Sequence, residues 1–132
     1  MDRTRILLQA AALNALVGAF IGSDMAGSGS FQFKAIHAHI LVVGWLSLFA
    51  FAIFYKVFQI PKKSILAKIH VISSLAGAIG LPIGLWFYYL TPFPTPHVFN
   101  LVFLILTGTL LLISFTVFVL IVFFNVRVIR ED

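Results

Sequence analysis

Two histidines stand one residue apart at the start of a long apolar segment. His37 and His39 precede an apolar run that continues through Phe54. A polar side chain in hydrocarbon is costly and usually marks a functional site. Successive residues of an α-helix turn by about 100°, so we expect the two imidazoles to point toward nearly opposite faces of one helix. They are therefore poorly placed to chelate one small ion together, and better placed to serve two sites or two neighbouring helices.

The composition places this chain in a membrane. Of its 132 residues, 61% are hydrophobic and only 10% are charged, and the mean hydropathy is +1.11. A soluble domain of this size would leave too much apolar surface in water. The absence of cysteine excludes disulfides and thiolate metal sites. Most charges lie at the ends and around one connection, so the net charge of +5 indicates topology rather than a nucleic-acid partner.

Four segments are long and apolar enough to cross a bilayer, which takes roughly 20 residues. The expected spans are residues 6–22, 35–58, 65–90 and 98–126. Residues that favour turns separate them at 27–30, 59–63 and 91–96. We therefore expect one all-α domain over residues 1–132, an integral membrane four-helix bundle.

The basic residues predict how these spans are oriented. They gather before the first span, around the second connection and after the fourth span: Arg3, Arg5, Lys56, Lys62, Lys63, Lys68, Arg127 and Arg130. The first and third connections contribute only Lys34. We therefore predict a multi-pass protein of the inner, cytoplasmic membrane with both termini cytoplasmic. His37, His39 and His97 then lie near the outer surface, and His70 lies ~20–30 Å away, near the cytoplasmic side.

Haem suits this setting better than a bare ion. A porphyrin buries a large apolar face between helices and needs only one or two axial imidazoles. We therefore expect His37 and His39 to bind the iron of haem b. Lys34 is placed to meet a haem propionate, and Trp45 to pack against the porphyrin. Snorkelling of Lys34 to the membrane surface and core packing of Trp45 are the ordinary alternatives.

A site for copper or zinc is the alternative from another class. Such a site needs three or four converging ligands, which here would be His37, His39 and His97, with Asp24 as an added carboxylate. It would suit a metal-binding or oxidase-assembly protein. The ordinary alternative for His97 is an interfacial residue at the start of a helix, and for His70 a residue beside the charged surface. Both are weaker candidates for metal ligands. A third reading is a structural subunit whose function is its contacts.

The segment 36–45, Ile-His-Ala-His-Ile-Leu-Val-Val-Gly-Trp, resembles the haem-bearing helix of haem-copper oxidase subunit I. In that family one histidine of such a pair ligates the low-spin haem and the other the high-spin haem, on opposite helix faces. The segment is also similar to the second-helix haem segment of nitric oxide reductases, where the histidine matching His37 ligates low-spin haem. Lys68-Ile69-His70 resembles the Lys/Arg-x-His found before the third span of small oxidase subunit I-like proteins.

The predicted four-span layout resembles one of the three pseudo-repeats that make up subunit I. The resemblance implies a homo-oligomer, with a trimer favoured, in which His37 of one protomer and His39 of the next hold a haem. It implies electron transfer with a redox partner, or interaction with O2 or NO. The family's copper-site motifs, His-Pro-Glu-Val-Tyr and a His-His pair, do not occur here. The proton-channel glutamate and the cross-linked tyrosine are missing as well. Whether the chain is an enzyme therefore stays open, and no catalytic residue is predicted.

Overall fold

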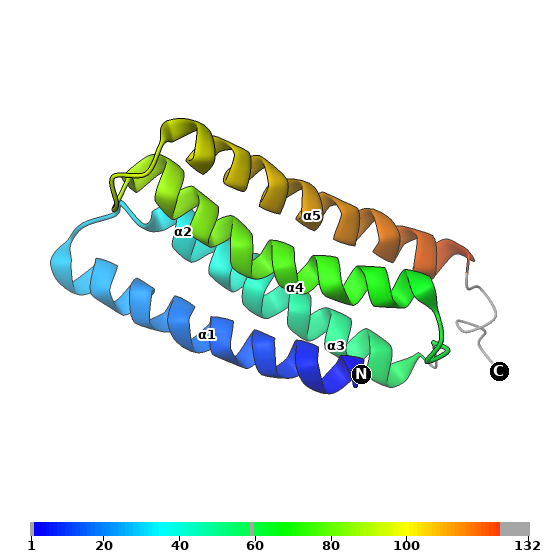
Figure 1. Cartoon of the computed structure of the whole chain (residues 1–132). Coiled ribbons are helices and arrows are strands. Elements are labelled where there is room, and N and C mark those ends of the chain that lie inside the picture. The colour runs from blue at the N-terminus through cyan, green and yellow to red at the C-terminus, as the bar shows by residue number, and fades with distance from the viewer. Residues whose placement is uncertain (1, 59, 125–132) are drawn as a thin grey trace.

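The computed structural model describes residues 2–58 and 60–124, and these form helices joined by short connections (Figure 1). The elements are α1 (Arg3–Ser28), α2 (Lys34–His39), η1 (Ile40–Ser47), α3 (Leu48–Val57), α4 (Ile65–Leu85), η2 (Trp86–Leu90) and α5 (His97–Phe124). The π-helical η1 joins α2 to α3 without a break, and η2 likewise extends α4. The described chain therefore contains four helices long and apolar enough to span a membrane, as predicted.

Helix α1 is longer than the span predicted for it, residues 6–22. The carboxylate of Asp2 accepts the backbone N–H of Arg5 and caps the start of the helix. The helix ends at Ser28, because Gly29 adopts a left-handed conformation with φ of 67° that glycine tolerates readily. The expected turn at residues 27–30 therefore begins two residues later than predicted.

The other three spans agree closely with the prediction. The second covers Lys34–Val57 and the third Ile65–Leu90, where the hydroxyl of Ser64 accepts a backbone N–H and caps the start. The fourth covers His97–Phe124, and the last two residues of the predicted span, 125 and 126, lie outside the described residues.

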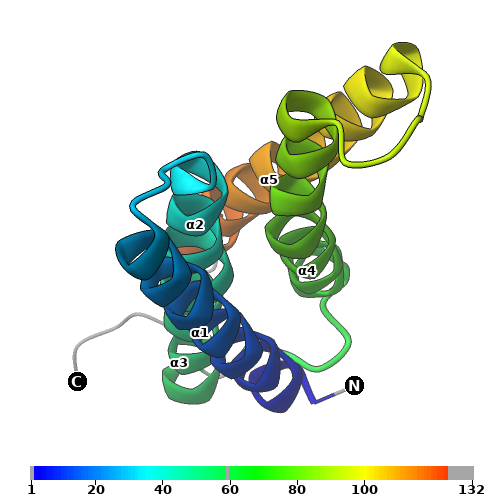
Figure 2. The same cartoon turned by 90° about the vertical axis from the view of Figure 1, so that its left-hand side faces the viewer.

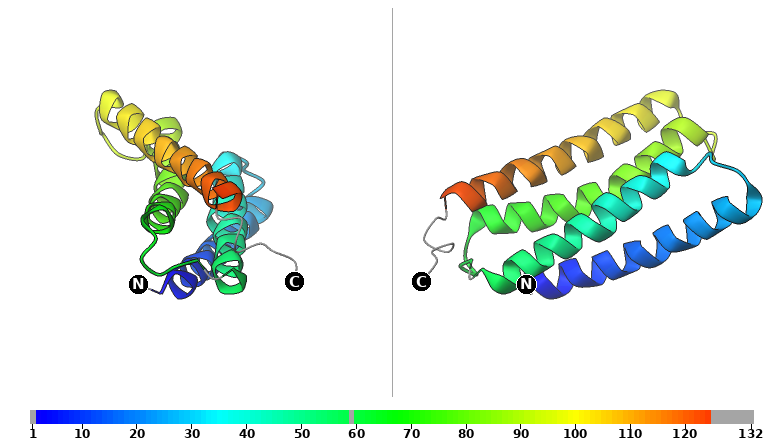
Figure 3. Two further views of the ribbon diagram at one scale, coloured as in Figure 1. Left: turned by 90° about the vertical axis from the view of Figure 1, so that its right-hand side faces the viewer. Right: turned by 180° about the vertical axis from the view of Figure 1, so that it is seen from behind.

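The four helices run up and down beside one another, and the two ends of the bundle differ (Figures 1 and 3). We call the end with the connections at residues 29–33 and 91–96 the histidine end, since His37 and His97 lie beside it. We call the opposite end, with the N-terminus and the connection at residues 58–64, the basic end.

Helix α5 packs against α4 and also reaches the 34–57 helix. It starts beside η2 and crosses toward the 34–57 helix (Figure 2). Near the basic end the ring of Phe118 lies 4.8 Å from that of Phe51 and 5.0 Å from that of Phe54, both in α3. A buried core forms nearby from α1, α3 and α4: Leu7, Ala11, Leu48, Phe51, Ala52, Val71 and Ala78.

Small and hydroxyl-bearing residues hold α4 against α5. A Cβ atom at Gly77 would lie 2.8 Å from the backbone of Leu111, so only glycine allows this approach. The hydroxyls of Ser74 and Ser114 form a buried hydrogen bond of 2.6 Å across the interface. Hydrocarbon surrounds such helices on all sides, so close packing and hydrogen bonds of this kind drive their association.

Candidate functional site

His37 lies on the face of its helix that packs against α1. Its Nδ1 atom is 3.0 Å from the carbonyl oxygen of Gly18. A Cβ atom at Gly22, one turn further along α1, would lie 2.8 Å from the imidazole Cε1. The ring therefore rests on a surface formed by two glycines and is half-buried there. Any larger residue at Gly22 would push against the ring.

His39 is bonded only to its own helix among the described residues. Its Nδ1 atom is 2.8 Å from the carbonyl oxygen of Ala35, and its ring is half-buried. His37 and His39 both belong to the regular α2 segment, where two residues turn the helix by about 200°. Because His37 faces α1, His39 faces away from α1.

Both imidazoles have the same hydrogen-bond pattern. A carbonyl oxygen can only accept, so Nδ1 is the donor in His37 and in His39. In a neutral imidazole the lone pair is then on Nε2. A histidine that binds a metal typically has its other ring N–H held in this way, which fixes the ring and its tautomer.

An apolar groove lies between α1, α2 and α4 near the histidine pair, and neither His37 nor His39 is among the residues that line it. Its part nearest the histidine end has a volume of about 240 Å³. Ile36 and Ile40, close to His37 on the same helix, line it together with Ile21, Phe33, Pro82, Ile83 and Trp86. A second part of about 330 Å³ shares Ile40, Pro82 and Ile83 and extends to Asn14. The groove suits an apolar ligand, since pockets for such ligands have apolar walls and few polar groups.

The side chains of Lys34 and Trp45 lie at different places around this site. Lys34 is the exposed first residue of α2, one turn before His37. Trp45 lies in η1 with 45% of its surface exposed, and it is not among the residues that line either part of the groove. Within one chain, Lys34 is thus beside the histidines, whereas Trp45 is turned outward.

The helix widens directly after His39. Over η1 the backbone is π-helical, and the Ser47 hydroxyl donates to the carbonyl of Val42 at 2.9 Å. Asn14 of α1 packs against Gly44 in this segment, where a Cβ atom would collide with the amide. Segments of π-helix occur frequently at functional sites, and this one separates the histidine pair from the regular helix α3.

His97 lies apart from the histidine pair. It is the exposed first residue of α5, and its ring centroid is 5.2 Å from that of Tyr88. Within residues 2–58 and 60–124, no three His, Asp or Glu side chains come together as a metal site would require. A single chain therefore does not assemble His37, His39 and His97 into a three-histidine set.

His70 is fully buried, although the basic residues around it in the sequence favoured a place beside the charged surface. Its Nδ1 atom is 2.9 Å from the Tyr55 hydroxyl, and its ring stacks on Phe118 at 5.3 Å between centroids. Its Nε2 atom is buried and has no hydrogen-bond partner among the described residues. The sequence contains a sign of this burial, because His70, Ser74 and Gly77 recur at helical spacing on the face of α4 that meets α5.

Comparison of the chain with protein-family models, with curated proteins and with solved structures gives no match. The class of protein therefore rests on the fold and the composition. The described chain is all-helical, and its four apolar helices are those of a multi-pass membrane protein.

Proposed function

We propose that this protein binds haem b inside the membrane, with His37 and His39 as axial ligands of the iron. The observation that carries the proposal is the shared hydrogen-bond pattern of the two imidazoles. In each, Nδ1–H donates to a backbone carbonyl, so the Nε2 lone pair is available to a metal. Two imidazoles on one iron suit one-electron transfer with a redox partner, whereas a single imidazole leaves the iron open to O2 or NO.

The apolar groove lined by Ile36 and Ile40, which are close to His37 in the chain, supports haem over a bare ion. A porphyrin needs an apolar slot and only one or two protein ligands. Ile36, Ile40 and Trp86 supply such walls, and Lys34 lies one turn from His37, where a propionate would meet its charge. A copper or zinc site would need a third ligand such as His97, which lies apart from the pair within one chain.

The opposite directions of His37 and His39 support an oligomer in which neighbouring protomers share the haem. Two side chains on opposite faces of one helix cannot reach the same iron from both sides. We propose a homo-oligomer, with a trimer favoured, in which His37 of one protomer and His39 of the next bind one haem. The similarity of residues 36–45 to the haem helix of haem-copper oxidases favours the same arrangement.

An absorption spectrum of the purified protein tests haem binding. We expect a Soret band and, after reduction, resolved α and β bands. His37→Ala and His39→Ala should each remove the haem or convert it to a high-spin form. His97→Ala is the matched control and should keep full haem loading, whereas a three-histidine copper or zinc site would lose its metal. A colourless protein that takes up no added haem would refute the proposal.

Mixing two inactive variants tests whether protomers share the haem. A mixed oligomer of His37→Ala and His39→Ala protomers contains interfaces where an intact His37 faces an intact His39. We expect such mixtures to regain part of the haem band that each variant lacks alone. If haem were bound within a single protomer, mixing would restore nothing.

We propose that the protein lies in the inner, cytoplasmic membrane with the basic end on the cytoplasmic side. The basic residues of the 58–64 connection and of the N-terminus support this orientation. The chain has no cysteine, so a single introduced cysteine gives a clean readout. In intact cells, a membrane-impermeant maleimide should label Ser30→Cys at the histidine end and leave Lys63→Cys unlabelled. The reverse labelling would invert the topology.

A further inference from the structure

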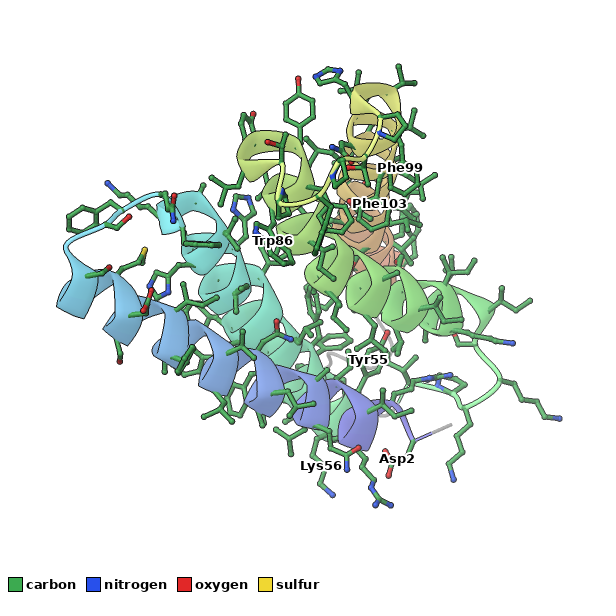
Figure 4. All side chains as sticks on the ribbon, turned by 60° about the vertical axis from the view of Figure 1, so that its left-hand side comes forward. Asp2, Tyr55, Lys56, Trp86, Phe99 and Phe103 are labelled. Atoms are coloured by element: carbon green, nitrogen blue, oxygen red, sulfur yellow. The ribbon has the colours of Figure 1, made fainter. Side chains whose placement is uncertain are left out.

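The basic end of the bundle contains a polar cleft between the start of α1 and the 58–64 connection. Its volume is about 450 Å³, and its walls are Asp2, Arg3, Thr4, Tyr55, Ile60 and Lys62. Figure 4 shows Asp2, Tyr55 and Lys56 gathered at this end of the molecule, with Trp86 toward the other end. The cleft is therefore separate from the histidine pair.

Arg3 fixes the geometry of the cleft. Its Nη2 atom donates to the carbonyl oxygens of Pro61 at 3.1 Å and of Lys62 at 2.6 Å. Its guanidinium carbon lies 5.6 Å from the centroid of the Tyr55 ring. These contacts hold α1 to the connection and keep a positive charge at the wall of the cleft. The exposed Lys62, which also lines the cleft, adds a second positive charge.

Positive charge dominates the surroundings of the cleft. Arg5, Lys56, Lys63 and Lys68 lie on the same end and are exposed. Asp2 is the single acidic residue in the sequence before Asp24, and its carboxylate is used to cap α1. Cationic side chains at the level of the lipid headgroups attract anionic lipids, and salt screens this attraction.

We propose that this cleft binds the phosphate of an anionic phospholipid. Lys62 and Arg3 face the phosphate with positive charge, and the Thr4 hydroxyl is a hydrogen-bond donor at the same wall. A lipid fits better than a soluble anion, because the four apolar helices place the cleft where headgroups lie and leave apolar helix surface for the acyl chains. The bound lipid then bridges α1 to the 58–64 connection and stabilises the bundle. This proposal is independent of haem binding.

Thermal unfolding in mixed micelles tests the lipid site. Phosphatidylglycerol added to phosphatidylcholine micelles should raise the unfolding temperature of the wild-type protein, and high salt should reduce the gain. Lys62→Gln should remove most of this gain and weaken lipid binding, because it removes a positive charge from the lining of the cleft. Lys63→Gln changes the net charge equally but lies outside the cleft walls, so it should keep most of the gain.

Native mass spectrometry of the same proteins supplies the second measurement. We expect one phosphatidylglycerol to remain bound to the wild type and to Lys63→Gln, and to be depleted in Lys62→Gln. Equal losses in the two variants would show diffuse attraction and overturn the site. A stability gain with inorganic phosphate alone would show that the ligand is a free anion rather than a lipid. No difference between phosphatidylglycerol and phosphatidylcholine would also overturn the proposal.

Discussion

The Nδ1 atom of His37 donates to the carbonyl oxygen of Gly18 at 3.0 Å, which joins the second helix to α1. One imidazole thus contributes to helix packing and leaves its Nε2 atom for a ligand. His39 has no such double role, because its Nδ1 atom donates to Ala35 in its own helix. Replacing His37 should therefore change the stability of the protein more than replacing His39, even though both are proposed to bind haem.

Replacing each histidine by alanine in haem-free protein measures that difference. His37→Ala should lower the free energy of unfolding, because an interhelical hydrogen bond in a membrane contributes about 0.6–1.7 kcal/mol and ring packing is lost as well. His39→Ala should change it little, since no described hydrogen bond to another helix is removed. Unfolding in mixed detergent micelles gives both values. Equal effects of the two variants would contradict the assigned roles.

A methyl group beneath the His37 ring should disturb the site specifically. Gly22→Ala places a Cβ atom 2.8 Å from the imidazole Cε1, so the ring must move. We expect weaker haem binding, or a shifted Soret band, in this variant. Gly27→Ala is the matched control, because a Cβ atom there meets nothing within 4 Å and the same helix contains it. The control should bind haem normally and gain up to about 1 kcal/mol of helix stability.

Tyr55 and the buried His70 should show strong coupling. Tyr55→Phe leaves the Nδ1 atom of His70 without its partner, in addition to the Nε2 atom, which has no partner among the described residues. We expect a loss of about 1–3 kcal/mol, the usual cost of an unsatisfied buried polar group. In the double variant Tyr55→Phe/His70→Phe both polar groups are gone, so the loss should be smaller than in Tyr55→Phe alone. A larger loss in the double variant would show that His70 has a partner beyond the described residues.

The contact between α4 and α5 should depend on the absence of a side chain at Gly77. Gly77→Ala would bring a Cβ atom within 2.8 Å of the Leu111 backbone, which cannot move aside as a flexible side chain can. We expect the helices to separate locally and stability to fall by about 1–3 kcal/mol, the usual cost of overpacking. Gly108→Ala is the control, since its nearest neighbour would be Leu81 at an ordinary 3.8 Å. Unfolding transitions of the two variants in the same detergent give the comparison.

The sequence by itself determined the elements of the fold and the directions of the paired histidines. Long apolar runs predicted four helices, and the second and third bounds agree within one residue at each end. The i, i+2 spacing of His37 and His39 predicted opposite faces from helical geometry alone, and His37 indeed faces α1. These properties are local, because they depend on chain composition and on the pitch of a single helix.

The tertiary structure decided which helix faces meet. It placed His37 on Gly18 and Gly22, buried His70 among Tyr55 and the aromatic residues of α3 and α5, and joined Ser74 to Ser114. The sequence could not supply these contacts, because a membrane helix is apolar on the faces that meet lipid and on those that meet protein. Its hydrophobic pattern therefore does not separate inside from outside, and small residues, hydroxyls and close packing between distant segments make that choice.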